Sequence, residues 1–178
     1  MRPILPLIVA AAAGAAVTAA CSTSGKREEV SSMTPSDPAT PAAQAAQPRV
    51  HLATPTGEIT VRVEVVSTPP TIQRGLMFRQ HLPLDAGMLF LMGEEDDHTF
   101  YMRNTLIPLD MIFIARDLTI AGIVENAEPR TETLRSVGKP SLYVLEVNGG
   151  WTRSHQVVPG AKVRFDGVSG VSGVNSVK

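Results

Sequence analysis

The 178-residue chain carries 16 Lys and Arg against 17 Asp and Glu, is 43% hydrophobic and has one cysteine. This length suits one ordinary globular domain with terminal extensions. The near-neutral charge provides no basic face for a phosphate backbone, which argues against a nucleic-acid partner, and a single cysteine excludes a disulfide scaffold.

Residues 1–21 are predicted to be a bacterial lipoprotein signal peptide. Arg2 precedes an uncharged run over residues 4–20 that is too short and too rich in Ala for a membrane span. Small residues stand directly before Cys21, as in a lipoprotein cleavage box, so Cys21 is the predicted lipid anchor. Thr18 occupies a position where Leu is usual, which leaves an ordinary secretory signal as the alternative. Both alternatives place the mature chain outside the cytoplasm, with the periplasmic side of the cell membrane or outer membrane expected for the lipoprotein.

The rest of the chain divides by composition. Residues 22–49 are rich in Ser, Thr, Pro, Ala and Gln and predict a flexible tether. Residues 50–166 hold the periodic apolar segments of a folded domain. Residues 167–178 alternate Gly, Ser and Val, which predicts a disordered tail.

The domain opens with a predicted hairpin. Residues 51–53 and 59–65 flank the turn residues 55–57, and alternate residues of the second strand are apolar. A helix is predicted to begin after Thr68, with Pro in its first turn, and to continue over residues 72–78.

Two further hairpins are predicted. Residues 87–92 and 98–103 flank the acidic run 93–97, which predicts a second hairpin with an acidic tip. Residues 109–115 and 118–124 predict a third.

The chain then offers a strand over 142–147, a turn over 148–150 leading into a short helix that ends at Ser154, and a closing strand over 157–165 that Pro159 and Gly160 interrupt. Seven or eight short strands with two short helices predict a compact, β-rich α+β domain. Its sheet is expected to be mainly antiparallel and to form an open sheet or a partly closed barrel.

Four segments resemble the domain of unknown function 192 family. They are Gly-Leu-Met-Phe-Arg at 75–79, Gly-Met-Leu-Phe at 87–90, the run Tyr-Met-Arg-Asn-Thr-Leu-Ile-Pro-Leu-Asp-Met-Ile-Phe-Ile at 101–114, and Leu-Glu-Val-Asn-Gly-Gly at 145–150 before Pro159 and Gly160. The family commonly has Trp and Lys in place of Tyr101 and Arg103, and Ala in place of Gly149. The resemblance implies a small exported or membrane-tethered β-rich domain with no established reaction.

The polar run from Arg103 to Asp110 lies between two apolar strands, so its polar groups must face solvent or find partners. One interpretation is a hydrogen-bonded loop locked by an ion pair of Arg103 or Asp110. The other is a cleft in which Arg103 recognises a carboxylate or sugar hydroxyls while Asn104 and Asp110 orient the ligand.

Glu146 shares the parity of Leu142 and Val144 in an apolar strand, so it is expected to point inward, where a carboxylate needs Arg or backbone donors. A pair of Asp110 and Glu146 would suit a hydrolase acting on an envelope polymer. A salt bridge to Arg79 or Arg103 is the competing interpretation.

Two metal sites are weighed. The carboxylates at 94–97 lack the ligand spacing of a calcium loop and are typical of a solvated turn. Thioethers select copper(I), but methionines on apolar strands are usually core residues; those considered, with His98 nearby, are Met77, Met88, Met92, Met102 and Met111.

Trp151 follows Gly149 and Gly150 and is interpreted as a core anchor or as a stacking platform for a sugar or peptide. The predicted function is binding of a small ligand or an envelope protein, without a cofactor or resident metal, and catalysis is not favoured. Hydrolysis and copper handling are the alternatives. The candidate ligand-binding residues are Arg79, Arg103, Asn104, Thr105, Asp110, Glu146, Asn148 and Trp151.

Overall fold

A computed structural model describes residues 47–171 of the chain. The predicted signal peptide, Cys21 and nearly all of the tether lie outside the described residues, as do the last seven residues.

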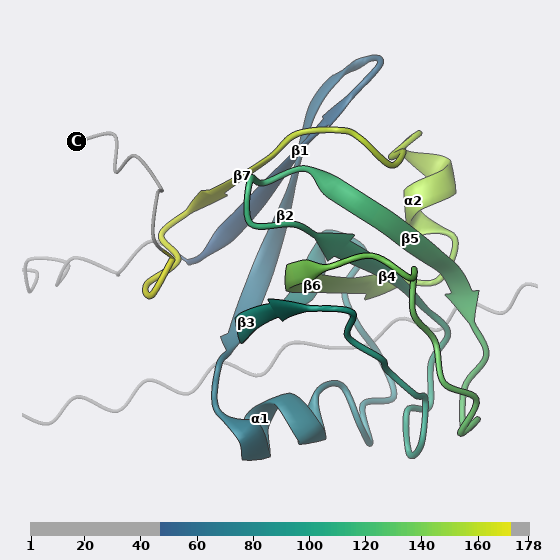
Figure 1. Ribbon diagram of the computed structural model, residues 1–178. Coiled ribbons are helices and arrows are strands. Elements are labelled where there is room, and N and C mark those ends of the chain that lie inside the picture. Colours follow the sequence, from purple (N-terminus) through teal and green to yellow (C-terminus); the bar gives the residue numbers. More distant parts are fainter. Residues whose placement is uncertain (1–46, 172–178) are drawn as a thin grey trace, which may run out of the picture. The chain divides into compact units, whose positions relative to one another are not determined.

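One mixed sheet of seven strands, in the order β5-β4-β6-β3-β2-β1-β7, forms the domain (Figure 1). Every neighbouring pair is antiparallel except β2 and β3, which are parallel and are joined through α1. The elements are β1 (Arg49–Thr54), β2 (Gly57–Val66), α1 (Pro69–Arg74), β3 (Ala86–Asp96), β4 (Leu109–Ile114), β5 (Ile120–Ala127), β6 (Ser141–Asn148), α2 (Trp151–Ser154) and β7 (Val163–Asp166).

The sheet curls until its two edges meet at one end. The amide of Ile120, at the start of β5, donates to the carbonyl of Ala161 at 3.0 Å, and the amide of Val163 in β7 donates to the carbonyl of Leu118 at 2.8 Å. The resulting half-barrel with two very short helices confirms the predicted β-rich, mainly antiparallel architecture. Neither helix within residues 47–171 is long and apolar enough to cross a membrane.

Each face of the sheet carries its own apolar core because side chains alternate between the faces. The inner core receives residues from all seven strands and from Trp151 of α2. The outer core is built on β3, β4 and β6 and is covered by Leu76, Leu82 and Met102 from the connecting segments. Figure 1 shows α1 on the outer side, beside β3.

The first and third predicted hairpins, the β6 strand and both short helices are confirmed, although α1 ends at Arg74 rather than at residue 78. The second predicted hairpin is wrong. β3 continues through the acidic run to Asp96 and pairs with β2 and β6, whereas residues 98–103 contribute a single bridge between Phe100 and Arg135.

At the C-terminal end, β7 spans only Val163–Asp166, because the chain turns at Gly160, whose φ of 87° is easy only for glycine. Residues 167–171, predicted as the start of the tail, include Val168 and Val171, which pack against the inner core.

Candidate functional site

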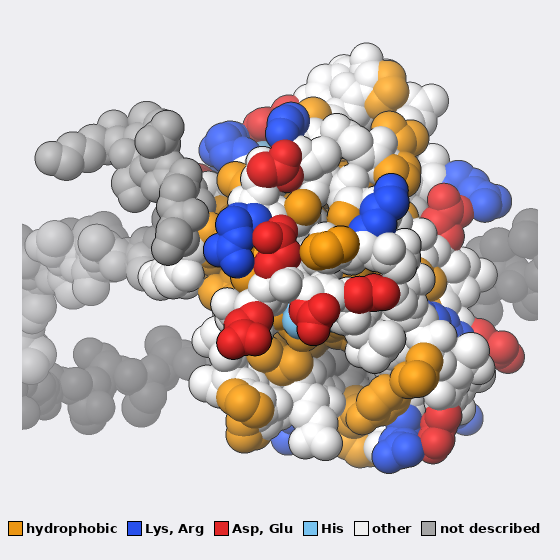
Figure 2. Space-filling model, viewed as in Figure 1, with side chains coloured by type: hydrophobic (Ala, Val, Ile, Leu, Met, Phe, Trp, Pro, Cys, Tyr) orange, Lys and Arg blue, Asp and Glu red, His pale blue; other side chains and the backbone are white. Residues whose placement is uncertain are grey.

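A pocket of about 170 Å³ opens on the outer face between the end of α1 and the segment that follows β3. We call it the Glu146 pocket. Figure 2 shows a hollow in this part of the surface, with acidic side chains above it. Its lining residues are Ile72, Gln73, Arg74, Gly75, Leu76, Met77, Phe90, Met92, Thr99, Phe100, Tyr101, Thr105 and Glu146.

Glu146 is the buried acidic residue of this pocket. It lies on β6 opposite Met88 of β3 and Met111 of β4, so its side chain shares their face, the outer one. It is 5% exposed, and within residues 47–171 it forms no ion pair or hydrogen bond that would compensate its charge. Burial alone raises the pKa of Glu146 to about 8, so the carboxyl is largely protonated at neutral pH.

The walls of the pocket come from segments far apart in the sequence. Gly75 ends α1 with φ of 45°, and a Cβ there would stand 3.1 Å from the ring of Phe90, so glycine is needed for both conformation and approach. Phe100 packs edge-on against Phe90 at 5.4 Å between ring centroids. Thr105, 5% exposed, is the second buried polar residue of the lining. The lining is therefore mixed. Apolar and aromatic side chains stand beside polar ones, which are Gln73, Arg74, Thr99, Tyr101, Thr105 and Glu146.

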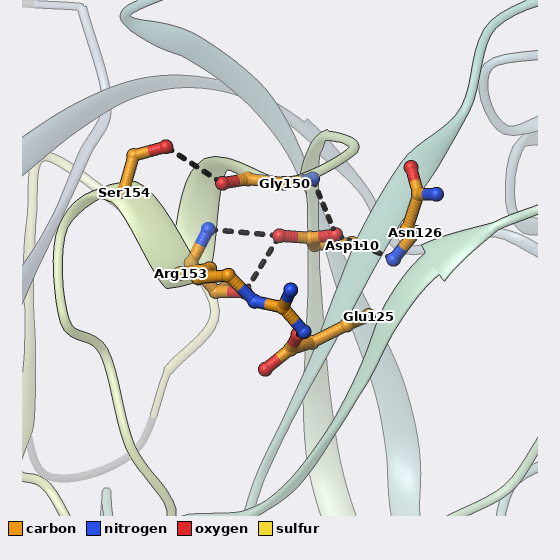
Figure 3. Close-up of polar contacts among 7 residues, drawn as sticks. Asp110, Glu125, Asn126, Gly150, Arg153 and Ser154 are labelled. Atoms are coloured by element: carbon orange, nitrogen blue, oxygen red, sulfur yellow. Dashed lines mark hydrogen bonds and ion pairs between the residues drawn. The ribbon is translucent and has the colours of Figure 1, made fainter.

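Asp110 is a structural brace. Its carboxylate is fully buried and accepts four hydrogen bonds: from the amides of Asn126 (2.7 Å), Gly150 (2.9 Å) and Thr152 (2.8 Å) and from the Thr152 hydroxyl (2.6 Å) (Figure 3). These bonds tie β4 to β5 and to the first turn of α2, where unpaired amides need acceptors. They support the hydrogen-bonded-loop interpretation for this residue.

The structure does not bring Asp110 and Glu146 together as a catalytic pair. Asp110 lies opposite Val147 of the inner core, whereas Glu146 lies opposite Met111 of the outer core. The two carboxyl groups therefore stand on opposite faces of the sheet, and the four donors around Asp110 leave it no room to act on a substrate.

The two candidate arginines form surface ion pairs with other partners. Arg79 forms two hydrogen bonds with Glu64, which lower the pKa of that carboxyl, and Arg103 reaches Glu132 through Nε at 2.9 Å and Nη2 at 3.0 Å. Arg103 also lies over the ring of Tyr101, 5.3 Å from its centroid. Neither arginine therefore compensates Glu146 or Asp110.

Asn104 serves the backbone. It adopts φ of 58°, a conformation that asparagine tolerates well, and its carbonyl accepts a hydrogen bond from the amide of Phe78 at 2.8 Å. This bond joins the polar run to the segment that follows α1, which together frame the Glu146 pocket.

Asn148 and Trp151 belong to a different depression, an open groove of about 730 Å³ that we call the Trp151 groove. The amide of Asn148 donates to the carbonyl of Leu82 at 3.0 Å, and Trp151, 7% exposed, stacks on His155 with centroids 4.3 Å apart. The tryptophan thus packs into the inner core, as the anchor interpretation expects. The groove lining is Ile59, Thr60, Leu84, Asp85, Asn148, Gly149, Gly150, Trp151, Ser154 and His155.

The residues weighed for metals are dispersed. Met88, Met102 and Met111 are buried in the outer core, while Met77 and Met92 line the pocket. In the acidic run Glu95 pairs with Arg116. Across residues 47–171, no three His, Cys, Asp or Glu side chains are grouped as metal ligands.

The Glu146 pocket was only partly foreseeable. The parity of Glu146 with Val144 predicted a buried side chain, which the structure places on the outer face of the sheet, and Thr105 belonged to the polar run. Phe100, Ile72 and Gln73 carried no signal, because their meeting depends on the parallel β2–α1–β3 connection. All four segments that carry the family resemblance contribute to the lining, through Gly75, Phe90, Thr105 and Glu146 among others.

Comparison with known proteins supports the fold. A crystal structure from Sinorhizobium meliloti 1021, of a protein provisionally described as a transcription regulator, is 40% identical, matches 69% of this chain and 96% of that one, and gives a TM-score of 0.66. A protein of unknown function from Novosphingobium aromaticivorans DSM 12444 is 40% identical over 65% of this chain and 83% of that one, with a TM-score of 0.64.

No curated protein matches the chain. The family model of DUF192, described as an uncharacterized ACR, matches residues 51–165, which is most of the chain and nearly all of the half-barrel. The chain therefore belongs to the DUF192 family.

Proposed function

We propose that this domain is a small-ligand binding module of the cell envelope and that the Glu146 pocket is its binding site. The observation that carries the proposal is the carboxyl of Glu146, which is buried in the pocket without a compensating partner in the described chain. A carboxyl whose pKa burial raises to about 8 makes the folded state less stable at neutral pH. A ligand that supplies the missing partner accounts for such a group, whereas Asp110 shows how this fold satisfies a carboxylate that is only structural.

The size and lining of the pocket limit the ligand. Cavities of about 150 Å³ hold a molecule the size of benzene, so about 170 Å³ suits a compact group with an apolar body and one polar end. Residues 50–166 carry 11 Arg and Lys against 14 Asp and Glu. This excess of negative charge does not favour binding to the phosphate backbone of a nucleic acid.

The proposed location depends on Cys21. We expect the wild-type protein to sediment with membranes and its mature N-terminus to carry acyl chains, because several chains together hold a protein firmly in a bilayer. Cys21→Ser should leave the protein without acyl chains, so that acyl chains no longer hold it in the membrane. Membrane fractionation with mass spectrometry of the N-terminal peptide measures both. A Cys21→Ser protein that still carries the N-terminal acyl mass would contradict lipidation at this residue.

The binding function is tested by thermal unfolding of the full chain in detergent with a panel of small probes that includes free amino acids, monosaccharides, n-butylurea and n-butylguanidinium. A ligand present at a hundred times its Kd stabilises the folded state by about 2.7 kcal/mol, which raises the Tm by roughly 5–10 °C. We expect at least one probe to produce such a shift in the parent protein.

Two variants decide where the probe binds. Glu146→Met keeps the length of the side chain but removes its polar end, and should abolish the shift. Glu128→Gln, at an exposed position outside the pocket, should preserve it. A probe that shifts the parent and Glu146→Met equally binds elsewhere, and a panel that shifts neither protein overturns the proposal.

A further inference from the structure

We infer that the Glu146 pocket takes a compact organic cation, an amine or guanidinium carried by an apolar body, which forms an ion pair with the Glu146 carboxylate. The inference rests on the proposed function and names the chemical class of its ligand.

The charges around the pocket are the first argument. Its titratable lining residues are Glu146, Arg74 and Tyr101, while the facing side chains from β3 and β4, Met88 and Met111, are apolar. Arg74 lies in the last turn of α1 and is exposed, so it belongs to the rim of the pocket. The buried carboxyl therefore has no cation from the protein beside it.

The neighbouring arginines do not fill this role, although both lie on segments that frame the pocket. Arg79 is held by Glu64, and Arg103 is held by Glu132 through two hydrogen bonds. Each guanidinium already has a carboxylate of its own at the surface. Within residues 47–171, Glu146 is the buried acid that has neither a basic partner nor hydrogen-bond donors, and a ligand cation would supply the missing partner.

The aromatic lining is the second argument. Phe90, Phe100 and Tyr101 line the pocket together with Glu146, and cations are attracted to the faces of aromatic rings. The acidic end of β3 lies directly before Thr99 of the lining, and Figure 2 shows acidic side chains above the hollow. Clustered negative charge near an opening raises the local concentration of cations.

Cation binding to this site must be coupled to proton release. Glu146 is largely protonated at pH 6, since burial raises its pKa to about 8, and it must ionise to pair with a cation. A guanidinium remains charged throughout this range. Its Kd should therefore fall roughly fifty-fold between pH 6 and pH 8, as the ionised fraction of the carboxyl rises.

The experiment compares n-butylguanidinium with its neutral isostere n-butylurea by titration calorimetry on the full chain in detergent. We expect the guanidinium to bind more tightly at pH 8 and to release about one proton at pH 6, measured from the heats in phosphate and ACES buffers. Glu146→Gln should lose guanidinium binding and the pH dependence, whereas the exposed Glu128→Gln should behave as the parent does.

The parent protein alone keeps the inference falsifiable if Glu146→Gln does not fold. Equal or tighter binding of n-butylurea at pH 8, or a guanidinium Kd that does not change with pH, would contradict a cationic ligand. The pocket would still be a binding site. Failure of both compounds to bind would also contradict a cationic ligand. The proposed function would then be tested by the wider probe panel alone.

Discussion

Asp110→Ala should lower the free energy of unfolding by about 3–5 kcal/mol, the range found when one partner of a buried charged network is removed. The substitution leaves three backbone amides and the Thr152 hydroxyl without their acceptor. It also detaches the start of α2 from β4. Urea unfolding of the parent and the variant measures the difference, with one common slope of free energy against urea concentration used for both proteins.

Asp166→Ala is the matched control, because Asp166 is exposed in β7 and forms no ion pair within residues 47–171. It should change the unfolding free energy by less than about 0.5 kcal/mol. A loss of under about 1 kcal/mol for Asp110→Ala would mean that water replaces the carboxylate, and the role of a brace would be refuted.

Local patterns predicted most of the strands because the side-chain period of two and the turn residues are written directly in the sequence. The hairpin of β1 and β2 and that of β4 and β5 each follow this rule. The second predicted hairpin was wrong because adjacency along the chain is only a tendency. β3 finds its partners in β2, across α1, and in β6, more than 40 residues later.

The site was harder to predict than the fold. The burial of Glu146 followed from its parity, but its lack of a partner did not, since the sequence alone offered both Arg79 and Arg103 as donors. Only the structure shows each of them engaged with another acid, Glu64 or Glu132. Likewise Asp110 and Glu146 are both buried acids, and the strand register alone places them on opposite faces.

Glu146 should make the folded protein less stable as the pH rises from about 5 to about 8. In the unfolded chain it titrates near 4.5, and burial raises its pKa in the folded state to about 8. Between these values the folded state retains a proton that the unfolded state releases, so stability falls with increasing pH and levels off above the folded pKa. At about 1.4 kcal/mol per pKa unit, the total decrease is roughly 3–5 kcal/mol.

Glu146→Gln isolates this contribution, because its neutral amide imitates the protonated carboxyl at every pH. Urea unfolding at pH 5 should give similar stabilities for the variant and the parent, and at pH 9 the variant should be more stable by roughly 3–5 kcal/mol. In Glu64→Gln, by contrast, the difference from the parent should be constant over this range, since Arg79 lowers the pKa of Glu64 and its contribution is lost only at more acidic pH.

A difference between Glu146→Gln and the parent that is equally constant would show that Glu146 is ionised and compensated in the folded state. The reason for assigning it a ligand would then disappear. If the difference grows as expected, the parent retains a carboxyl that weakens its fold at neutral pH, which is the usual trade of stability for function at a binding site.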